Sequence, residues 1–184
     1  MKYYSEHYKE YIDSTFPLSL KEEYSFLTAH LKEKASILDI GFGSARDMLY
    51  FKKCGYHVYG IEVVDGFINH AKELGLDVGY GDLRTYVPKE KVDCIFLNAV
   101  LLHLQRDEIY PAIRRLMSFL NDDGILFFSM KRSEKEDEYD EKGRYFTYFH
   151  KKDLETLPFR VIDYKINPDS QRKDIEWIDV ILGK

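Results

Sequence analysis

The sequence predicts an α/β fold with a mostly parallel sheet that helices cover on both faces. Short apolar segments of strand length alternate with amphipathic segments of helix length between residues 36 and 130. After residue 158 this alternation stops, and two segments with period-two patterning follow each other as in a β-hairpin. The first strand runs into two glycines at G-x-G spacing before a helical pattern, which is typical of a turn that binds an adenosine-like ligand.

The N-terminal segment, residues 1–31, is expected to form a helical cap. Tyr4, Tyr8 and Tyr11 recur there at helical spacing, and a second helical segment covers residues 18–31. The tyrosines fit either one buried face of an amphipathic helix or a lid over a binding site.

Five strands and three helices are expected in the central part of the chain. The strands cover residues 36–40, 57–61, 76–80, 92–97 and 124–130, and the helices cover residues 45–54, 65–75 and 107–120. The second helix has a good N-cap in Asp65 and ends at Gly75. Pro111 is compatible with the third helix only near its start.

The C-terminal third has a different character. Residues 131–143 are dense in charge and are expected to form a solvated loop. Residues 159–166 and 175–182 are expected to pair as a hairpin around a loop at 167–174.

Composition limits the class of protein. The 184 residues are 45% hydrophobic and 32% charged, which is typical of a soluble globular protein of one domain. The net charge of −5 argues against a nucleic acid bound through its phosphates, and no apolar stretch is long enough for a membrane helix. Cys54 and Cys94 lack disulfide-framework or metal-site spacing, so we expect reduced thiols, a cytoplasmic protein and no metal.

Polar residues stand where the predicted strands end. Glu62 ends the second strand, where a carboxylate accepts both hydroxyl protons of a ribose. Asp82 follows the third strand and could meet an adenine amino group while Leu83 packs on the ring. Asp39 lies two residues before Gly41.

Asn98 ends the fourth strand. Ligands of open parallel sheets bind just outside such strand ends, so we expect these groups to converge on one crevice.

At these positions the chain resembles a known family, the class I S-adenosylmethionine-dependent methyltransferases. Residues 39–47 are similar to the family's first motif, 60–62 to its acidic second-strand motif and 81–83 to its adenine-side motif. Residues 98–104 resemble the segment after strand four, and residues 120–124 the turn before strand five. The resemblance covers essentially the whole chain and is closest to small bacterial stand-alone enzymes.

This resemblance implies a Rossmann-like, doubly wound sheet of seven strands in the order 3-2-1-4-5-7-6, with the seventh strand antiparallel. It implies one domain over residues 1–184, with a cap at 1–31, a cofactor-binding core at 36–130 and a substrate-side segment with the hairpin at 144–184. S-adenosylmethionine is the implied cofactor. The residues expected to bind it are Asp39, Gly41, Phe42, Gly43, Arg46, Glu62, Asp82, Leu83 and Asn98.

One residue departs from the family's first motif. Ala45 stands where a third glycine is usual, which adds a methyl group and tightens packing against the ligand. A nicotinamide-binding domain is the competing interpretation, but its fingerprint needs a glycine three residues after Gly43, where Arg46 stands.

The acceptor side of the site is less defined by sequence. His103 is either a general base beside the transferred methyl group or a helix-start residue bonded to the backbone. Tyr8, Arg144 and Tyr148 are expected to bind an anionic or aromatic substrate.

A small-molecule acceptor is favoured because the Pro-Pro-aromatic motif of nucleic-acid amino-methyltransferases does not follow Asn98. A protein side chain is the second choice of acceptor. A module that binds the cofactor without turnover is the alternative function, and the sequence gives no oligomeric state.

Overall fold

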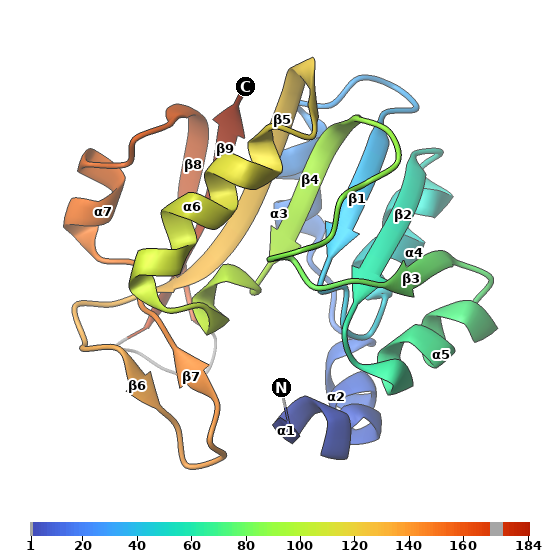
Figure 1. Ribbon diagram of the computed structural model, residues 1–184, viewed down its shortest axis with the longest axis horizontal. Helices are drawn as coiled ribbons and strands as arrows, with labels where there is room; N and C mark the ends of the chain where they lie inside the picture. The colour runs from blue at the N-terminus through green and yellow to red at the C-terminus, as the bar shows by residue number, and fades with distance from the viewer. Residues whose placement is uncertain (1, 170–174) are drawn as a thin grey trace.

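The computed structural model describes residues 2–169 and 175–184, and its centre is a seven-stranded sheet in the order β3-β2-β1-β4-β5-β9-β8 (Figure 1). The strands of this sheet are β1 (Ser36–Ile40), β2 (His57–Glu62), β3 (Asp77–Tyr80), β4 (Val92–Asn98), β5 (Leu120–Arg132), β8 (Arg160–Pro168) and β9 (Glu176–Gly183). The pairs from β3 to β5 are parallel, and β9 is antiparallel to β5 and β8. The predicted order 3-2-1-4-5-7-6 is therefore confirmed, with β8 and β9 as the sixth and seventh strands.

Helices cover both faces of the sheet, as predicted. They are α1 (Lys2–Glu6), α2 (Tyr8–Thr15), α3 (Lys21–Thr28), α4 (Arg46–Lys53), α5 (Asp65–Glu73), α6 (Arg106–Met117) and α7 (Lys151–Glu155), with a 3-10 turn η1 (Leu101–His103). Alternate residues of β1 face opposite layers: Ile37 packs with Phe51 of α4, and Leu38 belongs to the core that contains Ile113 of α6. Figure 1 shows α6 in front of the sheet and α3 behind it.

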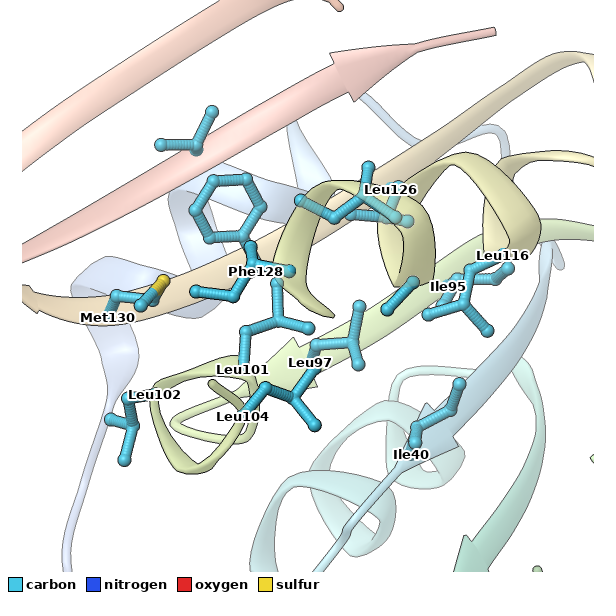
Figure 2. Close-up of a cluster of buried hydrophobic side chains, with 14 of the residues drawn as sticks. Ile40, Ile95, Leu97, Leu101, Leu102, Leu104, Leu116, Leu126, Phe128 and Met130 are labelled. Atoms are coloured by element: carbon cyan, nitrogen blue, oxygen red, sulfur yellow. The ribbon is translucent and has the colours of Figure 1, made fainter. Parts of the chain in front are cut away.

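The largest buried cluster lies between α6, η1 and the sheet (Figure 2). Leu97 of β4, Phe128 of β5 and Leu101 of η1 are fully buried within it. This packing holds the segment after β4 against the sheet, so the 3-10 turn that carries His103 is fixed by apolar contacts.

The predicted helix over residues 107–120 ends at Met117, and β5 begins at Leu120 instead of at residue 124. The reason is sheet pairing: Val92 donates its backbone N–H to Phe119 and pairs with Leu120. Tertiary pairing here overrides the apolar periodicity that continues to residue 120.

The charged segment predicted as a loop contains structure. Its first two residues extend β5, and β6 (Glu138–Tyr139) pairs with β7 (Tyr145–Phe146) in a small antiparallel hairpin. Asp140 fixes the turn of this hairpin, because its side chain accepts from the backbone N–H groups of Lys142 and Arg144. Strands of two residues are too short to show the period-two pattern by which a strand is predicted from sequence.

Smaller differences concern helix ends. The N-cap of α5 is Val64, and Asp65 is the first helical residue, so Asp65 makes no side-chain cap. The five-residue helix α7 was not predicted; a capping box between His150 and Asp153 begins it. Part of the loop predicted at 167–174 lies outside the described residues. In the described part of the chain, no helix has both the length and the apolar character needed to cross a membrane.

Candidate functional site

The carboxyl ends of β1, β2 and β4 border a cavity of about 980 Å³. Figure 1 shows α1, α2 and the β6–β7 hairpin gathered at this same end of the sheet. The cavity is lined by the following predicted residues: Gly41, Gly43, Glu62, Asp82, Leu83, Asn98, His103 and Arg144. Groups from four strand ends thus meet in one place, as the parallel topology predicts.

The glycine turn after β1 requires its glycines. Gly41 has φ +69°, and a Cβ there would lie 2.8 Å from Cγ2 of Val100. Gly43 has φ +53°, and a Cβ there would lie 3.1 Å from the ring of Tyr11. Both positions therefore combine a left-handed backbone with close packing, which only glycine tolerates well.

Ala45 occupies the third turn position with φ +62° and is fully buried. An alanine in this conformation is strained, so the turn is kept at a cost that glycine would not incur. Ala45 precedes α4, whose first residues carry unpaired backbone N–H groups.

Glu62 is held at the end of β2 by three backbone donors. Its Oε1 accepts from Val63 (2.6 Å) and Val64 (3.2 Å), and its Oε2 accepts from Gly43 (3.3 Å). Burial raises the pKa of Glu62, and the three N–H groups oppose that rise. The carboxylate is thus oriented into the cavity beside the glycine turn.

The third strand brings the expected adenine-side residues to the same wall. The backbone N–H of Gly81 donates to the carbonyl oxygen of Glu62 (3.1 Å). This bond continues the β2–β3 register and sets Asp82 and Leu83 next to the Glu62 carboxylate.

Beneath the turn lies a buried acidic cluster. Asp39 is 2% exposed, its Oδ2 has no hydrogen-bond partner, and burial raises its pKa well above the ordinary range, with the charges of Asp47 and Glu62 adding to the rise. Asp47 accepts from Tyr24 (2.5 Å) and from Asn98 Nδ2 (3.0 Å). Asp39 thus adds a carboxyl group with one unpartnered oxygen to the polar layer beneath the glycine turn.

Three of the expected cofactor residues do not line the cavity. The guanidinium of Arg46 pairs with Asp47 (2.7 Å) and donates to the carbonyl of Thr15 (3.1 Å), so it points away. Phe42 packs among the apolar residues under α4 and α5. Asp39 lies under the turn, where its contribution is electrostatic.

The acceptor side of the cavity is built from three distant segments. His103 Nδ1 lies 2.8 Å from the carbonyl oxygen of Tyr145 in β7, and its Nε2 lies 2.9 Å from the hydroxyl of Tyr4 in α1. Burial, together with the positive charges of Arg144 and Lys131, lowers the pKa of His103 to about 4, although the hydrogen bond to the Tyr145 carbonyl opposes this shift. Both interpretations of His103 are therefore compatible with its geometry, since it contacts the backbone and also lines the cavity.

The structure places Tyr8 and Tyr148 away from this cavity. Tyr8 packs against α5, with its ring 6.5 Å from that of Phe67. Tyr148 lines a separate cavity of about 230 Å³ near α6 and α7, and its hydroxyl donates to Glu138. Both rings contact Phe67 of α5, but Tyr11 also lies against Gly43 in the glycine turn, whereas Tyr8 lies against Gly66 in α5.

Arg144 lines the cavity as expected, but its guanidinium is engaged twice by Asp140 Oδ2, at 2.8 and 2.6 Å. Its charge is therefore largely neutralised within the hairpin.

Some site residues have no signal in the sequence. Ser129 of β5 donates to Asn98 Oδ1 (2.6 Å) and accepts from the N–H of Ala99, so it orients the end of β4. Tyr24 acts through its hydroxyl, which binds Asp47, and Tyr145 acts through its backbone carbonyl, which binds His103. Tyr4 and Tyr11 recur at a helical spacing that fits either a lid or a buried helix face, so the spacing alone does not identify them as site residues.

The donor set fits S-adenosylmethionine. The glycine turn has close walls, and the Glu62 carboxylate at the end of β2 is a group of the kind that accepts ribose hydroxyls. Within the described ranges, no group of three or more His, Cys, Asp or Glu side chains could hold a metal ion.

Comparison with known proteins agrees with this geometry. Residues 8–164 match the model of the methyltransferase domain family. The chain is 27% identical over 108 residues to (S)-coclaurine N-methyltransferase of Papaver somniferum, which covers 54% of this chain and 30% of that enzyme. The chain thus spans under a third of the length of this relative.

Two solved structures share the fold. One is a Burkholderia thailandensis 1,6-didemethyltoxoflavin-N1-methyltransferase with bound 1,6-didemethyltoxoflavin and S-adenosylhomocysteine (TM-score 0.81, 19% identity, 98% of this chain and 85% of that chain). The other is N-methyltransferase NodS of Bradyrhizobium japonicum with S-adenosylhomocysteine (TM-score 0.71, 16% identity, 98% of this chain and 97% of that chain). With its glycine turn, its strand-end acids and a family match over most of its length, the chain belongs to the methyltransferase domain family, as the resemblance to class I S-adenosylmethionine-dependent methyltransferases predicted.

Proposed function

We propose that this protein transfers a methyl group from S-adenosylmethionine to a small-molecule nucleophile by in-line displacement. The observation that supports it is that one cavity, of about 980 Å³, is lined both by the cofactor-side residues and by His103. Small-molecule pockets span about 300–1,000 Å³, so this volume leaves room for a second small molecule beside the cofactor.

The protein's contribution to this reaction is mainly positional. Bound S-adenosylmethionine supplies a methyl group on a positively charged sulfur. Glu62 would hold the ribose hydroxyls, Asp82 and Leu83 would bind the adenine, and the glycine turn would lie against the amino-acid part. Holding the acceptor in line with the methyl group is an orientation effect that can be worth about 7–11 kcal/mol. His103, with its lone pair at Nε2, would accept the proton of an acceptor that carries one.

The three residues predicted to bind the substrate do not contribute equally to this proposal. Arg144 lines the cavity and stays in the proposal as a wall of the acceptor site. Tyr8 and Tyr148 would act only through neighbouring residues, because both lie away from that wall.

A cytoplasmic location and the absence of nucleic-acid and membrane partners remain part of the proposal. They are supported by the net charge of −5 and by the free thiols of Cys54 and Cys94.

Methyl-labelled S-adenosylmethionine incubated with the protein and a cell extract tests the function. After the reaction, the extract is separated into a small-molecule filtrate and a retained protein fraction. Protein-dependent label in the filtrate supports the proposal. Label only in the retained fraction favours a protein side chain as acceptor, and label in neither favours a module that binds without turnover.

Gly41→Val is the matched control for this experiment. Its side chain would collide with Val100 and require a left-handed backbone, so it should abolish the label transfer. Thermal unfolding with S-adenosylmethionine and with a nicotinamide dinucleotide adds a second check: at 100 times its dissociation constant, the true cofactor adds about 2.7 kcal/mol of stability.

A further inference from the structure

The part of the cavity where the methyl acceptor would bind contains one hydrogen-bond acceptor, His103, whose protonation state follows from its partners. The carbonyl oxygen of Tyr145 can only accept, so Nδ1 of His103, at 2.8 Å, carries the proton. The imidazole is neutral, because burial lowers the pKa of His103 to about 4. Nε2 is therefore a bare lone pair, and the hydroxyl of Tyr4 donates to it at 2.9 Å.

Tyr4 lies at the edge of a buried cluster and is only partly buried, so its hydroxyl can move without exposing a fully buried side chain. It lies on α1, a helix of five residues with no buried side chain. Its ring contacts are edge-on, at 5.5 Å to Tyr3, Tyr11 and His103. A ligand donor that bonded Nε2 would replace one hydrogen bond with another, so the exchange is close to neutral.

The charges around the cavity do not favour an anionic acceptor. Among the described residues, each cation that lines the cavity is already engaged: Lys2 with Glu6 (3.8 Å), Arg84 with Glu108 (3.2 Å), Lys142 with the Tyr3 hydroxyl (3.3 Å) and Arg144 with Asp140 (2.6 Å). The carboxylates of Glu10 and Glu141 also line the cavity and, when ionised, can only accept. An anion in contact with Nε2 would meet a lone pair, while the described Lys and Arg side chains that line the cavity already have partners.

Flat apolar rings form much of the same wall. The rings that line the cavity are those of Tyr3, Tyr4, Tyr11, Phe67, Tyr139 and Tyr145. Aromatic side chains present flat faces and positive edges, which suit a planar ring that carries a polar substituent.

We propose that the methyl acceptor is an aromatic ring bearing an N–H or O–H group, which displaces the Tyr4 hydroxyl from His103 Nε2. This inference rests on the proposed function and names its substrate class. In the reaction, the lone pair of the acceptor nitrogen or oxygen forms the bond to the methyl carbon. The carbon–sulfur bonding pair stays with sulfur, the acceptor proton passes to Nε2, and from there it is released to water.

The test uses matched aromatic probes and needs no turnover. Phenol and aniline carry the donor, whereas anisole and N,N-dimethylaniline present the same rings without it. Each probe is titrated into the protein saturated with S-adenosylhomocysteine, and the histidine ring signals are followed by NMR, with His103 assigned by its loss in His103→Gln. Phenol and aniline should shift the His103 signals and bind at least about fivefold more tightly than their methylated counterparts.

Tyr4→Phe provides the discriminating variant. It removes the competing hydroxyl and keeps the ring, so the affinity for phenol should rise about two- to tenfold while that for anisole stays unchanged. Tyr164→Phe is the control, because this residue lies on β8 at 48% exposure and does not line the cavity, and it should change neither affinity.

Equal binding of phenol and anisole, a lower phenol affinity in Tyr4→Phe, or preferential binding of benzoate would each overturn the inference. These failures differ from failure of the proposed function, which would show as no label transfer to any small molecule. Label transfer confined to carboxylates or thiols would leave the methyltransferase proposal standing and remove this substrate class.

Discussion

Glu62→Gln separates cofactor recognition from folding. In the ligand-free protein the new amide oxygen can replace Oε1 and keep the bonds from Val63 and Val64. Only the longer bond from Gly43, at 3.3 Å, then faces an amide NH₂ group. The variant also removes the cost of burying the carboxylate charge, the cost that raises the pKa of Glu62, so the free energy of unfolding should change by no more than about 1 kcal/mol.

Cofactor binding should respond much more strongly. A carboxylate that accepts both ribose hydroxyls loses a charged hydrogen-bond partner in this variant, which costs about 1–3 kcal/mol or about 5- to 150-fold in Kd. Calorimetry with S-adenosylhomocysteine measures this loss without turnover, and chemical denaturation of the ligand-free protein measures stability. Glu90→Gln, at an exposed position, is the control and should match the parent in both. An affinity within twofold of the parent would show that Glu62 does not bind the ribose.

Three further substitutions test the surroundings of the glycine turn. Ala45→Gly relieves about 1–2 kcal/mol of left-handed backbone strain, but it loses a buried methyl worth about 0.8 kcal/mol and adds entropy to the unfolded state. The free energy of unfolding should therefore stay within about 1 kcal/mol of the parent, and the cofactor affinity measured by calorimetry should be equal or tighter. A clear loss of affinity would contradict this account of the loop. Asp39→Asn tests the raised pKa of Asp39. A carboxyl group whose pKa is raised in the folded state gives its full stabilisation below its unfolded pKa and loses it as pH rises through its folded pKa. The free energy of unfolding of the parent should therefore decline above pH 3.8 while that of the variant does not, and parallel profiles would argue against the raised pKa. Tyr24→Phe removes a buried bond to Asp47 and should cost about 1.5–3 kcal/mol in urea denaturation; a cost near zero would mean that this bond contributes nothing net.

The cofactor side of the site was predictable because its determinants are local. Glycines in the turn, Glu62 at the end of β2 and Asp82 after β3 each follow an apolar strand pattern in the sequence. Parallel topology then brings the strand ends together whatever the remaining side chains are. Period-two patterning predicted the hairpin of β8 and β9, and the resemblance to the family supplied their order in the sheet.

Predictions from the sequence were less accurate for side chains that can reach more than one partner. Arg46 had the position for a cofactor contact, but its guanidinium binds Asp47 and the carbonyl of Thr15, 31 residues away. Tyr8 and Tyr11 share one helical spacing, yet only Tyr11 lines the cavity. The orientation of α2 on the sheet decides this, and no local pattern encodes that orientation.

The acceptor side depends on contacts that only the folded chain can make. The hydroxyl of Tyr4 and the ring of His103 are separated by 99 residues, and His103 and the carbonyl of Tyr145 by 42. A backbone carbonyl sets the tautomer of His103, and any residue at position 145 could supply that carbonyl, so no motif carries the information. The hairpin of β6 and β7 and the short helix α1 can therefore change in sequence and alter the accepted substrate while the glycine turn and Glu62 stay as they are. We therefore expect the segments that pack over the sheet to set the specificity for the acceptor, and the strand ends beneath them to set cofactor use.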